Sequence, residues 1–128
     1  TFETLTDWDS TTDIKVGIHW YINEAYATAS AEVKWQGVYA CVPENGGEAV
    51  DSPTHTATIT TGDINIPATA KHAIESYMTI AAANIAVDDI IGVLISRVAL
   101  TGGTNPTAKP VIMKMEISYT ANKLGEAT

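Results

Sequence analysis

Two segments, one near each end of the 128-residue chain, alternate between apolar and more polar residues and constrain the fold most strongly. The first runs from Asp13 to Ile22 and the second from Val111 to Tyr119. Their apolar positions are Ile14, Val16, Ile18, Trp20 and Ile22 in the first, and Val111, Met113, Met115, Ile117 and Tyr119 in the second. Successive side chains of a β-strand point to opposite faces, so each segment predicts a strand with one buried face. Strands this far apart in the chain predict a fold that closes through long-range pairing.

Other segments of the chain carry a weaker extended pattern. Further strands are predicted at Glu32–Val42, Thr54–Thr61, His72–Ala81 and Ile90–Leu100, with a short edge strand within Thr1–Asp9. The segments between them are polar or rich in small residues and predict loops: Asn23–Ser30, Pro43–Pro53 (with room for a short strand at Glu48–Val50), Gly62–Lys71 and Thr101–Pro110.

The segment Glu32–Val42 has apolar residues on both parities. One parity carries Val33, Trp35, Gly37, Tyr39 and Cys41, and the other carries Val38, Ala40 and Val42. This predicts that its second half is buried on both faces or is covered by a neighbouring subunit. The glycine at position 37 predicts a β-bulge.

Seven or eight strands without a long amphipathic helix predict an all-β fold. An eight-stranded jelly-roll β-sandwich fits best, because long connections favour crossing between sheets over simple hairpins. An immunoglobulin-like sandwich is the alternative, and it is less favoured because the chain lacks a Cys…Trp…Cys arrangement. The length predicts a single β-sandwich domain over residues 1–128.

The composition narrows the range of partners. Seven basic and fifteen acidic residues give a net charge of −8, which disfavours binding to nucleic acid or to anionic membrane surfaces. No apolar run is long enough to span a membrane. Charged residues make up only 17% of the chain, which indicates that neighbouring subunits cover part of the surface.

No residue pattern in the chain predicts catalysis, a cofactor or a metal ion. The three histidines, His19, His55 and His72, have no metal-ligand spacing, and His19 is interpreted as a strand-surface imidazole. The pairs Asp7/Asp9 and Asp88/Asp89 are interpreted as loop caps because the calcium-loop spacing is absent. The single cysteine, Cys41, is interpreted as a core residue, and no serine lies in a nucleophile elbow. We therefore expect a protein that is not an enzyme and has no catalytic, cofactor-binding or metal-binding residues.

Several charged and aromatic residues receive structural interpretations. Glu32, Glu75 and Glu116 are expected on strand surfaces, with Lys34 and Lys114 as ion-pair partners for the first and the last. Arg97 lies on an apolar parity, so it either lies at the rim where the strand leaves the core or meets a carboxylate there, and we expect a partner such as Asp13, Glu75 or Asp89. Trp20 and Trp35 are predicted to be core residues, whereas Trp8, Tyr21 and Tyr26 are the candidates for exposed contacts.

Three strings resemble small jelly-roll structural proteins of tailed bacteriophages. The string 12–20 (TDIKVGIHW) resembles the T-D-I-K-V-x-I-H-W opening of those proteins. The string 85–97 (IAVDDIIGVLISR) resembles their x-x-G-D-x-x-x-x-x-I-x-R strand, with Asp88 in place of the glycine. Val111 to Tyr119 resembles their final strand, an alternating apolar run that ends in a tyrosine.

The resemblance implies a virion component without catalytic residues: a head decoration protein, a head fibre or a tail-associated domain, commonly trimeric. We therefore expect a non-enzymatic virion structural protein, a capsid decoration (cement) protein or fibre domain. Its expected partners are further copies of itself, as a trimer, and the major capsid or other virion proteins. The loops Pro43–Pro53 and Thr101–Pro110 would carry the contacts. The alternative is a carbohydrate-binding, receptor-binding β-sandwich module that contacts a cell-surface glycan.

Overall fold

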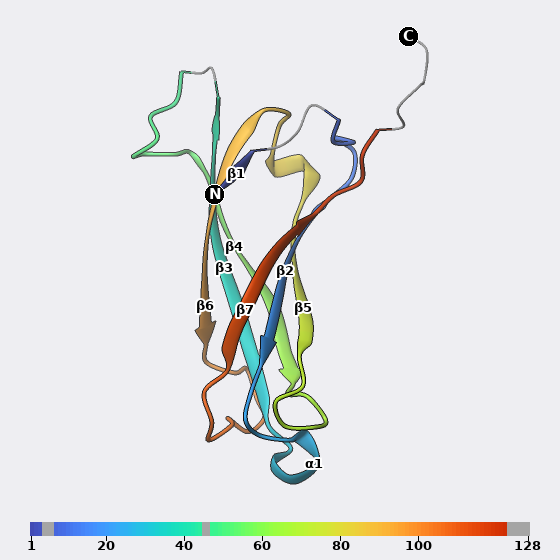
Figure 1. Cartoon of the computed structure of the whole chain (residues 1–128). Helices are drawn as coiled ribbons and strands as arrows, with labels where there is room; N and C mark the ends of the chain where they lie inside the picture. Colours follow the sequence, from blue (N-terminus) through green and yellow to red (C-terminus); the bar gives the residue numbers. More distant parts are fainter. Residues whose placement is uncertain (4–6, 45–46, 123–128) are drawn as a thin grey trace.

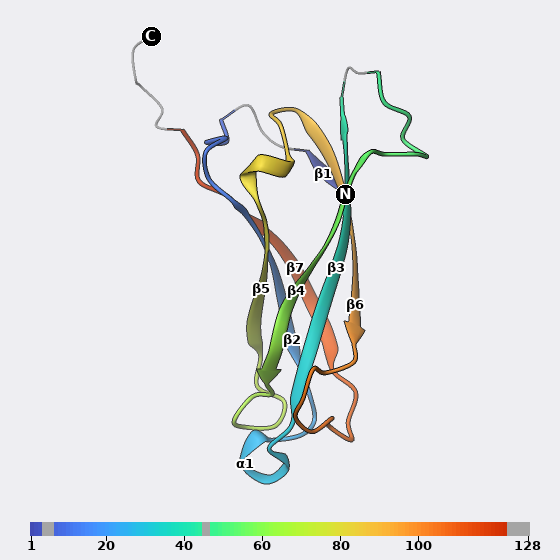
Figure 2. The ribbon, with the colours of Figure 1, turned by 180° about the vertical axis from the view of Figure 1, so that it is seen from behind.

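The strands of this protein form two antiparallel sheets that face each other (Figures 1 and 2). The computed structural model describes residues 1–3, 7–44 and 47–122. One sheet has the order β1 (Phe2–Glu3), β6 (Asp89–Val98), β3 (Glu32–Pro43) and β4 (His55–Asn65). The other has the order β5 (Ile74–Ile80), β2 (Ile14–Tyr21) and β7 (Val111–Ser118).

This arrangement confirms the predicted all-β sandwich. Within the described residues there are seven strands, one of them only two residues long, so the eighth strand of the predicted jelly roll is not found there. Only β3 and β4 follow each other within one sheet, and every other connection from β2 onward crosses between the sheets, as the long loops predicted. β1 is the expected short edge strand and pairs with β6.

Two short helical segments lie in the connections. The segment Asn23–Ser30 was predicted to be a loop, but Tyr26–Ala29 forms a one-turn helix, α1. Ser30 ends it in a left-handed conformation with a φ of 47°, and its N–H donates to the carbonyl of Tyr26. The second is a 3₁₀ turn, η1 (Ala82–Asn84). Neither segment of the described chain has the length or the apolar content to cross a membrane.

The core lies between the sheets and follows the predicted stripe of β2. Ile14, Val16, Ile18, Trp20 and Ile22 are all buried. Trp20 meets Trp35 of β3 edge-to-face, with ring centroids 5.6 Å apart and the planes at 70°. The indole Nε1 of Trp20 donates a hydrogen bond to Ser76 Oγ at 3.0 Å. The predictions that Trp20 and Trp35 are core residues and that β2 has one buried face are confirmed.

The core face of β3 is also as predicted, but Gly37 has a different role from the expected one. The register of β3 with β4 shifts between Lys34 and Gln36, not at Gly37. Gly37 faces the core, where a Cβ atom would lie 3.2 Å from Ile59 Cγ1 and 3.4 Å from Ile95 Cδ1. Its small size therefore serves the packing of its neighbours on β4 and β6.

The prediction that Val111, Met113, Met115, Ile117 and Tyr119 form one buried face of β7 is wrong for all but Ile117. Ile117 packs against the core, whereas the other four side chains are exposed. The pairing with β2 runs from His19↔Lys114 directly to Trp20↔Ile112, so Met113 is an extra residue on β7. Such a bulge reverses the side on which a residue points, and it places Val111 opposite Tyr21, away from the core. Met115 is opposite the buried Ile18, on the same side as Ile117, and it is exposed although β7 has not changed phase there.

Two other predictions about the strands also differ from the structure. The segment 48–50, where a short strand had room, contains no strand. β4 continues through Gly62 to Asn65 instead of ending at Thr61, and Gly62 adopts a φ of +71° within it.

Candidate functional site

The most distinctive surface of the described chain is the apolar edge formed by β7. Among the described strands, β7 pairs with β2 on one side only, so the backbone groups on its other side are without a strand partner. Four apolar side chains of this strand are exposed: Val111, Ile112, Met113 and Met115. We call this surface the β7 strip. Long apolar edge strands are the surfaces that natural proteins usually cover or charge.

A second, smaller apolar surface lies on the outer face of the other sheet. Val38 of β3 and Leu94 of β6 are directly opposite each other in the register. Leu94 is 70% exposed and Val38 is 41% exposed. We call this the Val38–Leu94 patch. Val42 is buried at the end of β3, but Val38 is exposed, so the chain alone does not bury the second half of this strand on both faces. The alternative prediction, that a neighbouring subunit covers this face, stays a prediction.

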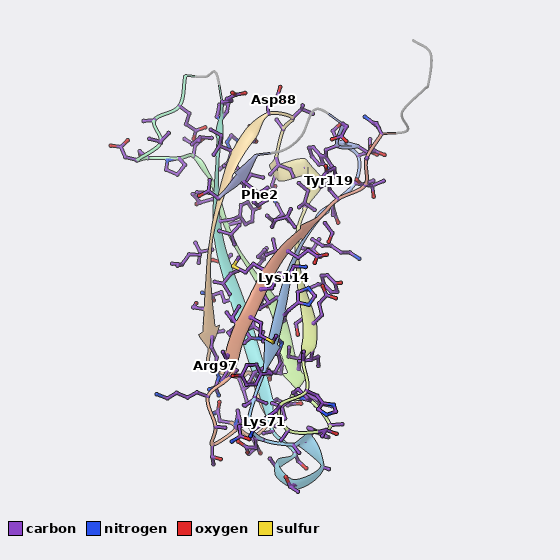
Figure 3. All side chains as sticks on the ribbon, in the orientation of Figure 1. Phe2, Lys71, Asp88, Arg97, Lys114 and Tyr119 are labelled. Carbon is purple, nitrogen blue, oxygen red and sulfur yellow. The ribbon has the colours of Figure 1, made fainter. Side chains whose placement is uncertain are left out.

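A polar cluster lies on the outer face of the β5–β2–β7 sheet. His19 Nε2 is 2.9 Å from Glu75 Oε1 and 3.3 Å from Glu116 Oε2. Lys114 Nζ is 2.6 Å from Glu116 Oε2 and donates a hydrogen bond to it. Figure 3 places Lys114 near the middle of β7. The predicted Lys114–Glu116 ion pair is confirmed.

The electrostatics of the cluster follow from these contacts. Lys114, and after it His19, hold the pKa of Glu116 below its ordinary value. The hydrogen bond to Glu116 raises the pKa of Lys114 in return. Glu75 raises the pKa of the neighbouring Tyr77. Every member is partly exposed, so the surrounding water weakens these interactions.

His19 has a partly buried place in this cluster that its position in the sequence did not reveal. The structure brings together His19, Glu75 and Glu116, whose three donor atoms lie within 4.8 Å of one another. His55 and His72 lie outside the cluster, and His55 contacts Glu48 instead, at 3.6 Å. One indication was available in the sequence: all three residues lie on the polar parity of predicted strands.

The two loops expected to carry partner contacts lie at opposite ends of the sandwich (Figure 1). The loop after β6 is held by carboxylates: Asp63 accepts hydrogen bonds from the N–H groups of Thr101 and Gly102, and Glu24 accepts one from the N–H of Ala108. These bonds hold the pKa of Asp63 and that of Glu24 below their ordinary values. The loop 101–110 is therefore anchored to the body of the protein.

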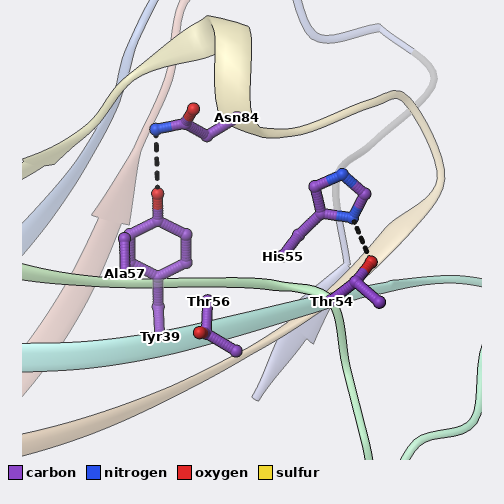
Figure 4. A pocket seen from close by; sticks show the side chains of 6 residues that line it. All are labelled: Tyr39, Thr54, His55, Thr56, Ala57 and Asn84. Atoms are coloured by element: carbon purple, nitrogen blue, oxygen red, sulfur yellow. Dashed lines mark hydrogen bonds between the residues drawn. The ribbon is translucent and has the colours of Figure 1, made fainter.

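A small hollow lies beside the start of β4 (Figure 4). Its volume is about 160 Å³, and Asn84 Nδ2 donates a hydrogen bond to Tyr39 Oη at 3.1 Å across it. His55 Nδ1 lies 3.4 Å from the hydroxyl of Thr54 at its rim. Pockets for small organic ligands usually have volumes of roughly 300–1,000 Å³. This hollow is therefore a poor candidate for a ligand site.

The aromatic residues proposed for exposed contacts are distributed differently from expectation. Trp8 is 1% exposed and donates from its indole nitrogen to the carbonyl of Thr12, so the prediction that it is exposed is wrong. It is held by the pairing of residues 8 and 121, which joins the segment before β2 to the one after β7. Tyr21 and Tyr26 are partly exposed.

The predicted partners of Arg97 are also wrong. The guanidinium of Arg97 donates a hydrogen bond to Asn105 Oδ1 at 3.0 Å, and the described residues place no carboxylate in an ion pair with it. Arg97 and Asp88 lie at opposite ends of β6 (Figure 3), so Asp89 is out of reach. Asp13, which directly precedes β2, accepts a hydrogen bond from the N–H of Ala82 instead. Glu75 lies in the polar cluster.

The remaining structural interpretations are mostly confirmed. Asp9 accepts hydrogen bonds from the N–H and hydroxyl of Thr11, and Asp89 accepts one from the N–H of Ala86. Cys41 is buried, and burial raises the pKa of its thiol to about 11. The expected pair of Glu32 and Lys34 is not formed, because Lys34 Nζ donates to the hydroxyl of Thr101.

These features describe an all-β sandwich protein whose main surface features are an apolar edge and a polar cluster. Comparison of the chain with protein-family models, with curated proteins and with solved structures gave no match. The resemblance to the phage jelly-roll proteins therefore stays a prediction.

Proposed function

We propose that this protein is a non-enzymatic structural protein of a phage particle, which works by assembling with copies of itself and with other virion proteins. The observation that carries the proposal is the β7 strip, an unpaired strand edge with four exposed apolar side chains. Apolar edges of this kind favour association with another chain. The capsid decoration and fibre roles follow from the sequence resemblance, and the jelly-roll assignment follows from the predicted strands and their long connections. Both belong to the same proposal.

The occupant that we propose for the β7 strip is a second copy of this chain, within a trimer. In a cyclic trimer each interface joins two different surfaces, one from each of two neighbouring subunits. The protein carries two separate apolar surfaces, the β7 strip and the Val38–Leu94 patch, on different sheets. Covering the first with the second, around a threefold axis, removes both from water in every subunit.

The charge of the chain is compatible with this arrangement. A net charge of −8 opposes non-specific contact between copies, so self-association needs a specific apolar interface. The two apolar surfaces carry few charges: Lys114 lies between Met113 and Met115 of the β7 strip, and its charge is balanced by Glu116.

The experiment is light scattering during size-exclusion chromatography on the wild type and on three variants. Leu94→Glu and Met113→Glu place a carboxylate in each apolar surface, and we expect both to shift the trimer to monomer. Ser96→Glu is the matched control, because Ser96 is exposed on the outer face of β6 two residues from Leu94. It adds the same charge and should leave the trimer intact. A wild type that remains monomeric, or a Ser96→Glu effect equal to that of Leu94→Glu, would refute the interface.

The position on a particle needs a separate test. Mass spectrometry of purified phage particles should detect this chain in stoichiometric amounts. Its absence from the particles, with a stable trimer in solution, would refute the virion assignment and leave the interface standing.

The glycan-binding alternative has less support from the arrangement of aromatic residues. Such a platform needs neighbouring exposed aromatics on one face, and Trp8, one of its three candidates, is buried. A glycan array with the purified protein tests it directly. Specific binding that is lost in Tyr21→Ala or Tyr26→Ala would favour this alternative.

A further inference from the structure

The polar cluster on the outer face of the β5–β2–β7 sheet has the composition of a metal site. One imidazole nitrogen and two carboxylate oxygens come from three neighbouring strands: His19 from β2, Glu75 from β5 and Glu116 from β7. Zinc sites are built from these donor types, often with three protein ligands and a water molecule in the fourth position. The cluster adjoins the β7 strip, because Lys114 lies between Met113 and Met115 on β7 and Glu116 follows Met115.

The register of the sheet, and not a chance contact of long side chains, brings the three residues together. His19 is directly opposite Glu75, and Glu116 is directly opposite Gly17, two residues from His19 along β2. Gly17 leaves the space between them open. A Cβ atom at this position would lie 3.2 Å from Glu75 Oε1, so any larger residue would crowd that carboxylate.

The three donor groups converge on one ring nitrogen. His19 Nε2 lies 2.9 Å from Glu75 Oε1 and 3.3 Å from Glu116 Oε2, and the nitrogen itself is covered by protein atoms. A divalent ion bound here would replace these two contacts and take one donor atom from each side chain.

The distances between the donor atoms suit a small divalent ion. Ligand bonds of about 2.0–2.1 Å in a tetrahedral zinc site place neighbouring donor atoms about 3.3 Å apart. The observed separations from His19 Nε2 are 2.9 Å and 3.3 Å. All three donor atoms lie within 4.8 Å of one another, so rotation of the two glutamate side chains would arrange them around the ion.

The charges of the cluster also suit a divalent cation. Two carboxylates and a neutral imidazole would balance a charge of +2. The ammonium group of Lys114 now neutralises Glu116, and its side chain is 60% exposed, so it is free to swing into solvent when the ion binds. The ligand side chains are 29–39% exposed, which leaves access for the ion and for water.

We propose that His19, Glu75 and Glu116 bind a divalent transition-metal ion of the zinc type, which links the three strands of the β5–β2–β7 sheet. The ion would fasten both edge strands to the central one. Its consequence would be a more stable sheet and a better-ordered β7.

The test uses the full chain, freed of metal with a chelator, and zinc chloride as the probe. Isothermal titration calorimetry should show one ion per chain, and thermal unfolding should shift to higher temperature with added zinc. In Glu75→Gln and Glu116→Gln, we expect at least the roughly 10- to 100-fold loss of affinity that is usual for changes around a metal ligand. Circular dichroism checks that these surface variants are folded.

His72→Asn is the matched control, because His72 is exposed and lies outside the cluster. It should bind zinc as the wild type does. The ¹⁵N resonances of the imidazole rings give a second readout, in which the His19 signals alone should shift on addition of zinc. The proposal is overturned if zinc neither binds nor stabilises the protein. It is equally overturned if both glutamine variants bind zinc as the wild type does, or if the His72→Asn variant loses binding.

Discussion

Replacing Ser76 with alanine should destabilise the protein although it removes only one oxygen atom. Ser76 is 7% exposed, and its hydroxyl accepts the hydrogen bond from the indole nitrogen of Trp20, which is fully buried. The Ser76→Ala variant leaves that N–H in the core without an acceptor. An unsatisfied buried donor costs about 1–3 kcal/mol in the free energy of unfolding. For a domain of this size, that corresponds to a fall in Tm of roughly 4 °C for each kcal/mol.

The assay is urea unfolding followed by tryptophan fluorescence, with Thr79→Ala as the control. Thr79 is exposed on the same strand, so its loss should change the free energy of unfolding by less than about 0.5 kcal/mol. In the Trp20→Phe background the donor is already absent, so Ser76→Ala should cost much less there than in the wild type. Equal costs in the two backgrounds, or a Ser76→Ala effect no larger than that of Thr79→Ala, would refute the hydrogen-bond explanation.

Three further predictions follow from the core and the loops. The Cys41 thiol, buried and with its pKa raised to about 11, should react with an alkylating reagent only under unfolding conditions, which mass spectrometry of the labelled protein would reveal. The pKa of Asp63 is lower in the folded protein than in the unfolded chain. The stability that the Asp63 carboxylate gives to the loop 101–110 is therefore present above the pKa of the unfolded chain, and it is lost as the pH falls through the pKa of the folded protein. The protection of the Thr101 and Gly102 amides from hydrogen exchange, relative to the intrinsic rate at each pH, should therefore fall in acid, and Asp63→Asn should lower it already at neutral pH. Gly37→Ala should cost about 1–3 kcal/mol in the free energy of unfolding, measured by urea titration, because the new methyl group crowds Ile59.

The sequence predicted best what depends on the alternation of side chains within one strand. The buried face of β2 could be predicted from the alternation of apolar and polar residues, because this alternation does not depend on the neighbouring strands. The phase of β7 could not be predicted in the same way. The extra residue Met113 is defined only by the pairing with β2, and the order of residues along β7 does not reveal it.

The polar cluster was beyond prediction for a related reason. His19, Glu75 and Glu116 are far apart in the chain, and only the order β5–β2–β7 with its register makes them neighbours. Arg97 is a second example. Its parity predicted a carboxylate partner, but its position near the end of β6 places it beside Asn105. Local patterns predict which side a residue faces, but the topology decides which residue it meets.

The association of copies through the β7 strip is the central claim, and native mass spectrometry of the wild-type chain tests it most directly. We expect the main species to have three times the mass of the 13.6 kDa chain, with the amides of β7 protected from hydrogen exchange. A single-chain species at every concentration, with fast exchange along β7, would contradict it.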